Sequence, residues 1–208
     1  MSDRNVEKTQ LRTRMVGGLR AEDDGSADRL GGWVHRRRDL GGLLFVDLRD
    51  RSGLVQVSFG PDWTEAASME VARGIGHEDV ILVEGVVATR PEGARNPELP
   101  TGEIEFRATR VEIVSDARTP EIPVYQAPED ELPAEELRLQ HRVLDLRRAE
   151  LQENLVLRHK LVLETRNFMD RHGFLEVETP ILTKATPEGA RDYLVPSRVH
   201  KGEFYALP

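Results

Sequence analysis

Short hydrophobic runs separated by turn-forming residues occupy the first half of the chain. Runs rich in Val, Leu and aromatic residues cover residues 30–38, 43–49 and 54–59, and the segments between them contain Gly and Asp. β-branched and aromatic residues favour strands, whereas Gly and Asp favour tight turns. The pattern predicts three consecutive strands joined by short turns.

A helix and two further strands are expected next. Residues 63–73 contain good helix formers, preceded by Pro61-Asp62 and followed by Gly74, which are typical of helix boundaries. The alternating patterns of residues 79–89 and 103–114 then predict two more strands. Five strands with a helix between the third and fourth is the element order of the OB-fold, a small β-barrel that binds oligonucleotides.

The second half of the chain begins with a proline-rich and acidic segment, which favours an exposed connector. We therefore expect a polar tail at residues 1–10, a barrel domain at 11–115, a linker at 116–136 and a second domain at 137–208. The fold class is α+β.

Hydrophobic residues at helical spacing predict an amphipathic helix over residues 150–172, which Gly173 ends. Residues 174–182 alternate apolar and acidic positions, which predicts a half-buried strand. Pro180 lacks a backbone N–H and confines that strand to an edge or an irregular position.

Composition narrows the class of protein. The 208 residues include 38% hydrophobic residues, enough for an ordinary core, and no cysteine, which excludes disulfides and cysteine-based zinc sites. The six histidines lack metal-site spacing, so we expect no metal site built by the protein. With neither a signal-peptide pattern nor an apolar stretch of about 20 residues, we expect a cytoplasmic chain that does not enter a membrane.

The formal net charge of −8 argues against nucleic-acid binding at first sight, because phosphate contacts come from Lys and Arg. The charges are, however, separated along the chain. Residues 36–38 are three consecutive arginines, with Arg49 and Arg51 nearby, while much of the acidity lies in residues 128–136. An acidic chain can therefore still present a basic face.

A basic and aromatic cluster is the first candidate for function. On paired strands Arg36 to Arg38 would lie beside Phe45, with Gln56 on the same or an adjacent sheet face. Aromatic rings stack on unpaired bases, and Gln presents a donor and an acceptor to a base edge. An alternative stays open, in which the arginines are merely solvated and Phe45 packs in the core. We expect Trp33 to be a core residue.

A second candidate is the segment 186–192, which cannot form regular structure and places Glu188 beside glycine. Its carboxylate could accept charge-assisted hydrogen bonds from a substrate ammonium group. An acidic surface loop explains the same residues, and periodicity does not distinguish the two.

Several motifs resemble the N-terminal part of bacterial-type aspartyl-tRNA synthetases. The barrel segments WVHRRRDLGG, FVDLRDR, LVQV and TGEIE look like that family's anticodon-binding domain, and RVLDLRR resembles the lead into its catalytic domain. Residues 173–182 are similar to class II motif 1. Residues 183–208 are the closest match and separate this family from the related asparaginyl and lysyl enzymes.

The resemblance implies roles for individual residues. Arg38, Phe45 and Gln56 would contact the tRNA anticodon loop, and Glu188 would bind the L-aspartate substrate. Motif 1, with Gly173 and Pro180, would form a homodimer interface in the full-length enzyme.

The resemblance also implies a reaction. The family activates L-aspartate with ATP and Mg²⁺ and transfers it to tRNA, here tRNA-Asp or also tRNA-Asn. Motifs 2 and 3, which hold ATP, are absent from these residues, so we expect no catalytic residue here and no tight cofactor binding. Ser58 departs from the pattern, since some members carry an aromatic residue there.

Two other functions remain open. The chain could be a free-standing tRNA-binding or regulatory module derived from a synthetase. It could also be a general single-stranded nucleic-acid OB protein, which would leave the motif 1 segment without a purpose.

Overall fold

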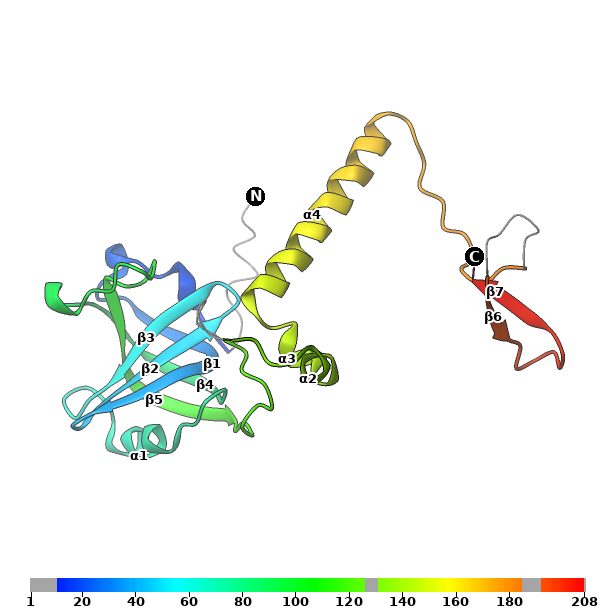
Figure 1. Cartoon of the computed structure of the whole chain (residues 1–208). Coiled ribbons are helices and arrows are strands. Elements are labelled where there is room, and N and C mark those ends of the chain that lie inside the picture. The colour runs from blue at the N-terminus through cyan, green and yellow to red at the C-terminus, as the bar shows by residue number, and fades with distance from the viewer. Residues whose placement is uncertain (1–10, 126–130, 185–191, 208) are drawn as a thin grey trace. The chain divides into compact units, whose positions relative to one another are not determined.

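The computed structural model describes residues 11–125, 131–184 and 192–207. The chain forms two compact units, Met1–Asp145 and Leu146–Pro208. Each unit is described by itself below (Figure 1).

The first unit contains a closed five-stranded barrel, which confirms the predicted OB-fold. Neighbouring strands around the barrel are hydrogen-bonded in the order β1-β2-β3-β5-β4. Helix α1 lies between β3 and β4 in the sequence. The bounds are β1 (Ala27–Leu40), β2 (Leu43–Asp50), β3 (Gly53–Phe59), α1 (Ala66–Gly74), β4 (Val80–Thr89) and β5 (Ile104–Ser115). Short 3-10 helices accompany them at Val16–Gly18, Ala21–Asp23 and Glu92–Ala94.

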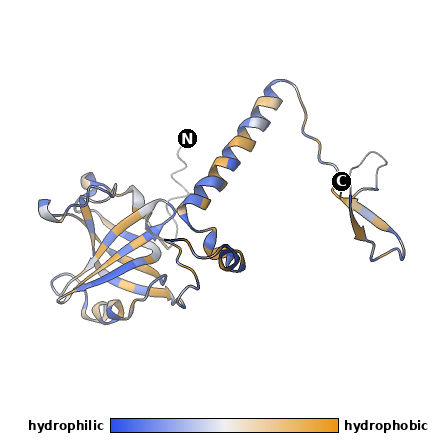
Figure 2. Cartoon of the chain, viewed as in Figure 1, coloured by the Kyte–Doolittle hydropathy of each residue, from blue (hydrophilic) through white to orange (hydrophobic). Residues whose placement is uncertain are grey.

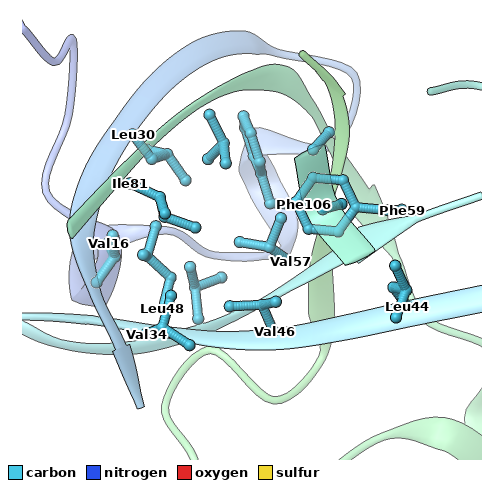
Figure 3. Close-up of a cluster of buried hydrophobic side chains, with 14 of the residues drawn as sticks. Val16, Leu30, Val34, Leu44, Val46, Leu48, Val57, Phe59, Ile81 and Phe106 are labelled. Atoms are coloured by element: carbon cyan, nitrogen blue, oxygen red, sulfur yellow. The ribbon is translucent and has the colours of Figure 1, made fainter. Parts of the chain in front are cut away.

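Side chains at alternate positions along the strands fill the barrel interior. In β2 the residues Leu44, Val46 and Leu48 are buried, and the residues between them are only partly covered. The interior also contains the fully buried rings of Phe59 and Phe106 (Figure 3). Because burying such a side chain contributes roughly 1.5–3 kcal/mol, this core supplies the main stabilisation of the barrel. Figure 2 shows the same alternation of hydrophobic and hydrophilic residues along the strands.

Closure of the barrel depends on β1, which pairs with two strands. Its first half pairs with β4 and its second half with β2, and the register with β2 shifts between Val34 and Arg36. A bulge of this kind bends and twists a strand. Near the bend, a Cβ on Gly32 would lie 2.4 Å from the carbonyl oxygen of Arg49, so only glycine allows this close strand approach.

The segment after β5 is mostly exposed, as expected of a connector, but it is anchored at two points. Ile122 and Val124 are buried, with 1% and 4% of their surfaces exposed. Two short helices follow, α2 (Glu135–Gln140) and α3 (Arg142–Asp145). Arg142 pairs with the buried carboxylate of Asp145 at 2.6 Å. The linker bounds 116–136 stay a prediction.

The second unit begins with helix α4 (Ala149–Arg171), which agrees with the predicted helix. None of its residues is buried, so its apolar positions are exposed. Gly173 follows it with a φ of +82°, and Phe174 N donates to Met169 O at 3.1 Å, a typical helix C-terminus. A two-stranded antiparallel sheet, β6 (Tyr193–Pro196) and β7 (Phe204–Leu207), completes the unit.

The strand predicted at residues 174–182 is wrong. These residues form no helix or strand, and the first pairing after them is an isolated bridge between Thr183 and Ala206. Alternating apolar residues favour a strand only where a partner strand supplies hydrogen bonds, and none of the described residues does so here. Leu175, Val177 and Ile181 are consequently 74–87% exposed. No helix in the described parts of the chain is long and apolar enough to cross a membrane.

Candidate nucleic-acid interface

One row of side chains crosses the outer face of the barrel. Arg38 on β1 is the register partner of Phe45 on β2, and Phe45 is the partner of Ser58 on β3. These residues alternate with the core positions Val46 and Val57, so they point away from the barrel interior.

A second row lies beside the first and joins it through hydrogen bonds. Asp47 on β2 is the register partner of both Arg36 and Gln56. Arg38 Nη2 donates to Asp47 Oδ1 at 2.7 Å and to Gln56 Oε1 at 3.3 Å. The guanidinium and the amide are therefore oriented in advance, and 38% of the Arg38 side chain remains exposed.

Phe45 is only partly buried and does not belong to the core cluster. The interpretation that placed Phe45 in the barrel core is therefore wrong. Arg38, Phe45 and Gln56 lie on one face, as the strand pattern allowed. Trp33 was expected in the core and is 38% exposed, so that prediction is also wrong. Trp33 is the register partner of Arg49 on β2 and of Val80 on β4, at the bend of β1. Its side chain lies on the outer side of the barrel.

The hairpin between β1 and β2 carries the exposed basic residues. Arg36 and Arg37 are exposed near its end, and the turn uses Gly41 and Gly42 with φ values of +66° and +103°. Residues other than glycine rarely adopt these conformations. The turn therefore allows a tight hairpin that presents two guanidinium groups to solvent.

Arg90 is a member of the site that the sequence gave no reason to select. Its Nε donates to Ile104 O at 2.6 Å, and its Nη2 is buried without a hydrogen-bond partner among the described residues. Burial lowers the pKa of Arg90, while the nearby carboxylates of Glu105 and Asp47 act in the opposite direction. The Arg90 side chain is buried, with 6% of the residue exposed, and it lies close enough to Asp47 and Arg38 for their charges to act on it. Arg90 directly follows β4 and is distant in sequence from residues 36–56, so only the strand pairing brings it near them.

The remaining predicted site residues belong to other segments of the chain. Glu188 lies outside the described residues. Gly173 and Pro180 lie in the second unit, and their role at a dimer interface stays a prediction. Among the described residues, no group of three or more His, Cys, Asp or Glu side chains could hold a metal ion.

Comparison with known proteins relates both units to one class of enzyme. Residues 29–114 match the OB-fold nucleic acid binding domain family, and residues 134–208 match the class II tRNA synthetases (D, K and N). The chain is 56% identical over 198 residues to the Aspartate–tRNA(Asp/Asn) ligase of Salinibacter ruber. It is 50% identical over 197 residues to that of Bacillus subtilis. The chain is a homologue of the bacterial aspartyl-tRNA synthetases.

The similarity covers 95% of this chain in both alignments, but only 31% and 33% of those relatives. The synthetase homologue therefore spans about a third of the length of the curated relatives it matches. Among solved structures, asparaginyl-tRNA synthetase from Pyrococcus horikoshii has a TM-score of 0.73 and 26% identity, covering 91% of this chain and 41% of that one. A putative aspartyl-tRNA synthetase from Leishmania major has a TM-score of 0.79 at 20% identity, covering 96% and 39%. This second likeness supports the fold alone.

Proposed function

We propose that the barrel of this synthetase homologue binds the anticodon loop of tRNA through the face formed by Arg38, Phe45 and Gln56. The observation that carries the proposal is the register of β1, β2 and β3. It places a guanidinium, an aromatic ring and an amide side by side on the outer surface. Unpaired RNA bases are recognised by this combination of stacking and edge hydrogen bonds.

Each group has a distinct role in this proposal. The Phe45 ring stacks on one base, and the Gln56 amide hydrogen-bonds the edge of another. Arg38, held by Asp47, adds donors for a base edge or a phosphate, and the buried Arg90 adds positive charge beneath the face. The exposed Arg36 and Arg37 attract the phosphate backbone, so binding should weaken as salt rises.

The RNA is proposed to be tRNA-Asp, with tRNA-Asn as a second substrate, because the similar ligases carry the name Asp/Asn. An RNA hairpin with an aspartate anticodon should bind more tightly than a hairpin of equal length with an unrelated loop. Fluorescence anisotropy of the two labelled hairpins tests this. Equal affinities would instead favour a general single-stranded nucleic-acid OB protein.

We propose that the longer protein catalyses the ATP-dependent ligation of L-aspartate to tRNA, with Glu188 binding the aspartate. ATP with Mg²⁺ supplies the activation of the carboxylate in such a ligase, and the resemblance assigns the groups that hold ATP to motifs 2 and 3, which these 208 residues do not contain. We therefore expect the 208 residues alone to form no aspartyl-adenylate. Pyrophosphate exchange above background by the purified chain would contradict this expectation. A chain that binds the hairpin but lacks exchange would fit both a fragment of the ligase and a tRNA-binding module derived from one.

We also propose that motif 1, including Gly173 and Pro180, packs against a second copy in the longer protein, which we place in the cytoplasm with its tRNA. The apolar side chains of Leu175, Val177 and Ile181 are exposed, and burial against another copy would remove them from water. Sedimentation of a chain extended to the length of its relatives should give a dimer, and Val177→Asp should shift it to a monomer. A dimer unchanged by that substitution would argue against this interface.

A further inference from the structure

The outer row of the barrel continues onto a fourth strand. Ser58 on β3 pairs with Arg107 on β5, so the row runs from Arg38 through Phe45 and Ser58 to Arg107. Phe45 and Arg107 are two strand spacings apart, about 10 Å. The far end of the row therefore lies within reach of the RNA segment that contacts Phe45.

Arg107 makes a cation–π contact with an aromatic ring. Its guanidinium carbon lies over the Trp63 ring, 5.2 Å from the ring centroid, and its Nε donates to Glu105 Oε1 at 3.0 Å. These two contacts limit the movement of a long side chain that is still 45% exposed. The guanidinium therefore lies within cation–π distance of the indole and remains partly open to solvent.

Trp63 is itself fixed in place. Its Nε1 donates to the carbonyl oxygen of Ser58 at 3.1 Å. Its ring lies so close to Gly60 that a Cβ there would be 2.5 Å from a ring carbon. The ring thus forms a rigid support beneath Arg107 at the edge of the row.

The small side chain of Ser58 makes room for this arrangement. Ser58 faces outward by its position in β3, but it is completely buried, so neighbouring side chains cover it. Ser58 itself therefore offers no surface to a base. Trp63 supplies the aromatic ring at this part of the face instead, and its hydrogen bond to the Ser58 backbone holds the ring there.

We propose that Arg107, supported by Trp63, forms a second stacking position that holds the base next to the one stacked on Phe45. Bases stack on guanidinium planes as well as on aromatic rings, and a guanidinium held against an indole is already oriented for this contact. The inference rests on the proposed anticodon-loop function of the same face. It adds a residue pair that extends the binding face from β2 to β5.

The experiment uses the 208-residue chain and RNA hairpins with an aspartate anticodon, each carrying one abasic residue at a different loop position. With the unaltered chain, removal of the base at the second stacking position should weaken binding about five- to 150-fold. In Arg107→Gln, the intact hairpin should bind more weakly, and removal of that same base should cost little more. In Phe45→Ala, the insensitive position should be the neighbouring one.

Two further variants separate stacking from charge and from folding. Arg107→Lys keeps the positive charge but loses the planar guanidinium group. Its binding to the abasic hairpins should therefore follow the same pattern as that of Arg107→Gln. Arg110→Gln removes the same charge from the same strand, where Arg110 pairs with Glu65, and should leave the abasic pattern unchanged. In a Trp33→Phe background, Trp63 is the remaining tryptophan, and the hairpin should quench its fluorescence.

The outcomes distinguish this inference from the proposed function. If Arg107→Gln binds every hairpin like the unaltered chain while Phe45→Ala weakens binding, the second stacking position is wrong and the anticodon face stands. If neither variant changes binding, the proposed face itself is wrong.

Discussion

Arg38 donates a 2.7 Å hydrogen bond to Asp47, its diagonal neighbour on the adjacent strand. With 38% of the Arg38 side chain and 19% of the Asp47 side chain exposed, the ion pair adds little to stability. Its consequence is positional, since it holds the guanidinium beside Gln56 and Phe45 on the outer face.

Asp47→Asn should weaken binding of the anticodon hairpin about three- to tenfold, because the guanidinium loses its charged anchor. In an Arg38→Ala background the same substitution should have little effect. Anisotropy titrations of the two single variants and the double variant measure this coupling. If the carboxylate only repelled phosphates, Asp47→Asn would tighten binding in both backgrounds.

Phe45→Ala and Gln56→Ala should each weaken binding of the cognate hairpin by about 1–3 kcal/mol, the range for lost stacking and base-edge contacts. Both side chains are only partly buried, so the barrel should remain folded in each variant. Arg73→Ala, on α1, serves as the control and should bind like the unaltered chain. Unchanged titration curves for both face variants would remove the basis of the proposed binding face.

Ser58→Ala should stabilise the barrel by about 1 kcal/mol. The Ser58 hydroxyl is buried without a hydrogen-bond partner among the described residues, and a buried unpaired polar group is costly. Ser68 is the matched control, because its buried hydroxyl accepts a hydrogen bond from Val111 N at 3.3 Å. Ser68→Ala should therefore destabilise. Urea unfolding of the two variants measures both changes, and a loss of stability in Ser58→Ala would refute the first.

His35 should make stability depend on pH. Its Nδ1 lies 2.9 Å from Arg49 Nη1, and its ring meets the Tyr125 ring edge-on. Burial lowers the pKa of His35, and the positive charge of Arg49 lowers it further, whereas Asp47 and Glu78 act in the opposite direction. The unfolded chain then binds a proton at a higher pH than the folded chain does. Stability should therefore fall as the pH drops below about 6.5 towards the folded-state pKa.

Urea unfolding at about pH 7.5 and about pH 5.5 tests this dependence. His35→Gln should lose less stability between the two pH values than the unaltered chain. His77→Gln, which replaces a neighbouring half-exposed histidine, should keep most of the loss, because His77 lowers the pKa of His35 less than burial and Arg49 do. Equal losses in all three proteins would show that His35 is not responsible.

Local sequence patterns were enough to predict the barrel. The alternation of apolar and polar residues in 43–49 specifies one buried face for that strand, and Gly with Asp between the hydrophobic runs specifies tight turns. The five strands and their positions along the chain therefore follow from neighbouring residues alone. The motif resemblance then selected Arg38, Phe45 and Gln56. The same local reasoning failed for residues 174–182, because a strand requires a partner that an alternating pattern cannot supply.

The side on which Phe45 lies, and the residues beside it, depended on contacts between distant parts of the chain. An alternating pattern divides the side chains of a strand between two sides of the sheet but does not say which side is turned to the core. Phe45 and Trp33 could therefore not be placed from the sequence. Arg107 joined the face because β5 pairs with β3, a strand more than 30 residues away, and Arg90 came near it because the end of β4 pairs with β5. Hydrogen-bond register is a non-local property, and it alone assembles these cations around the ring and amide that the sequence had suggested.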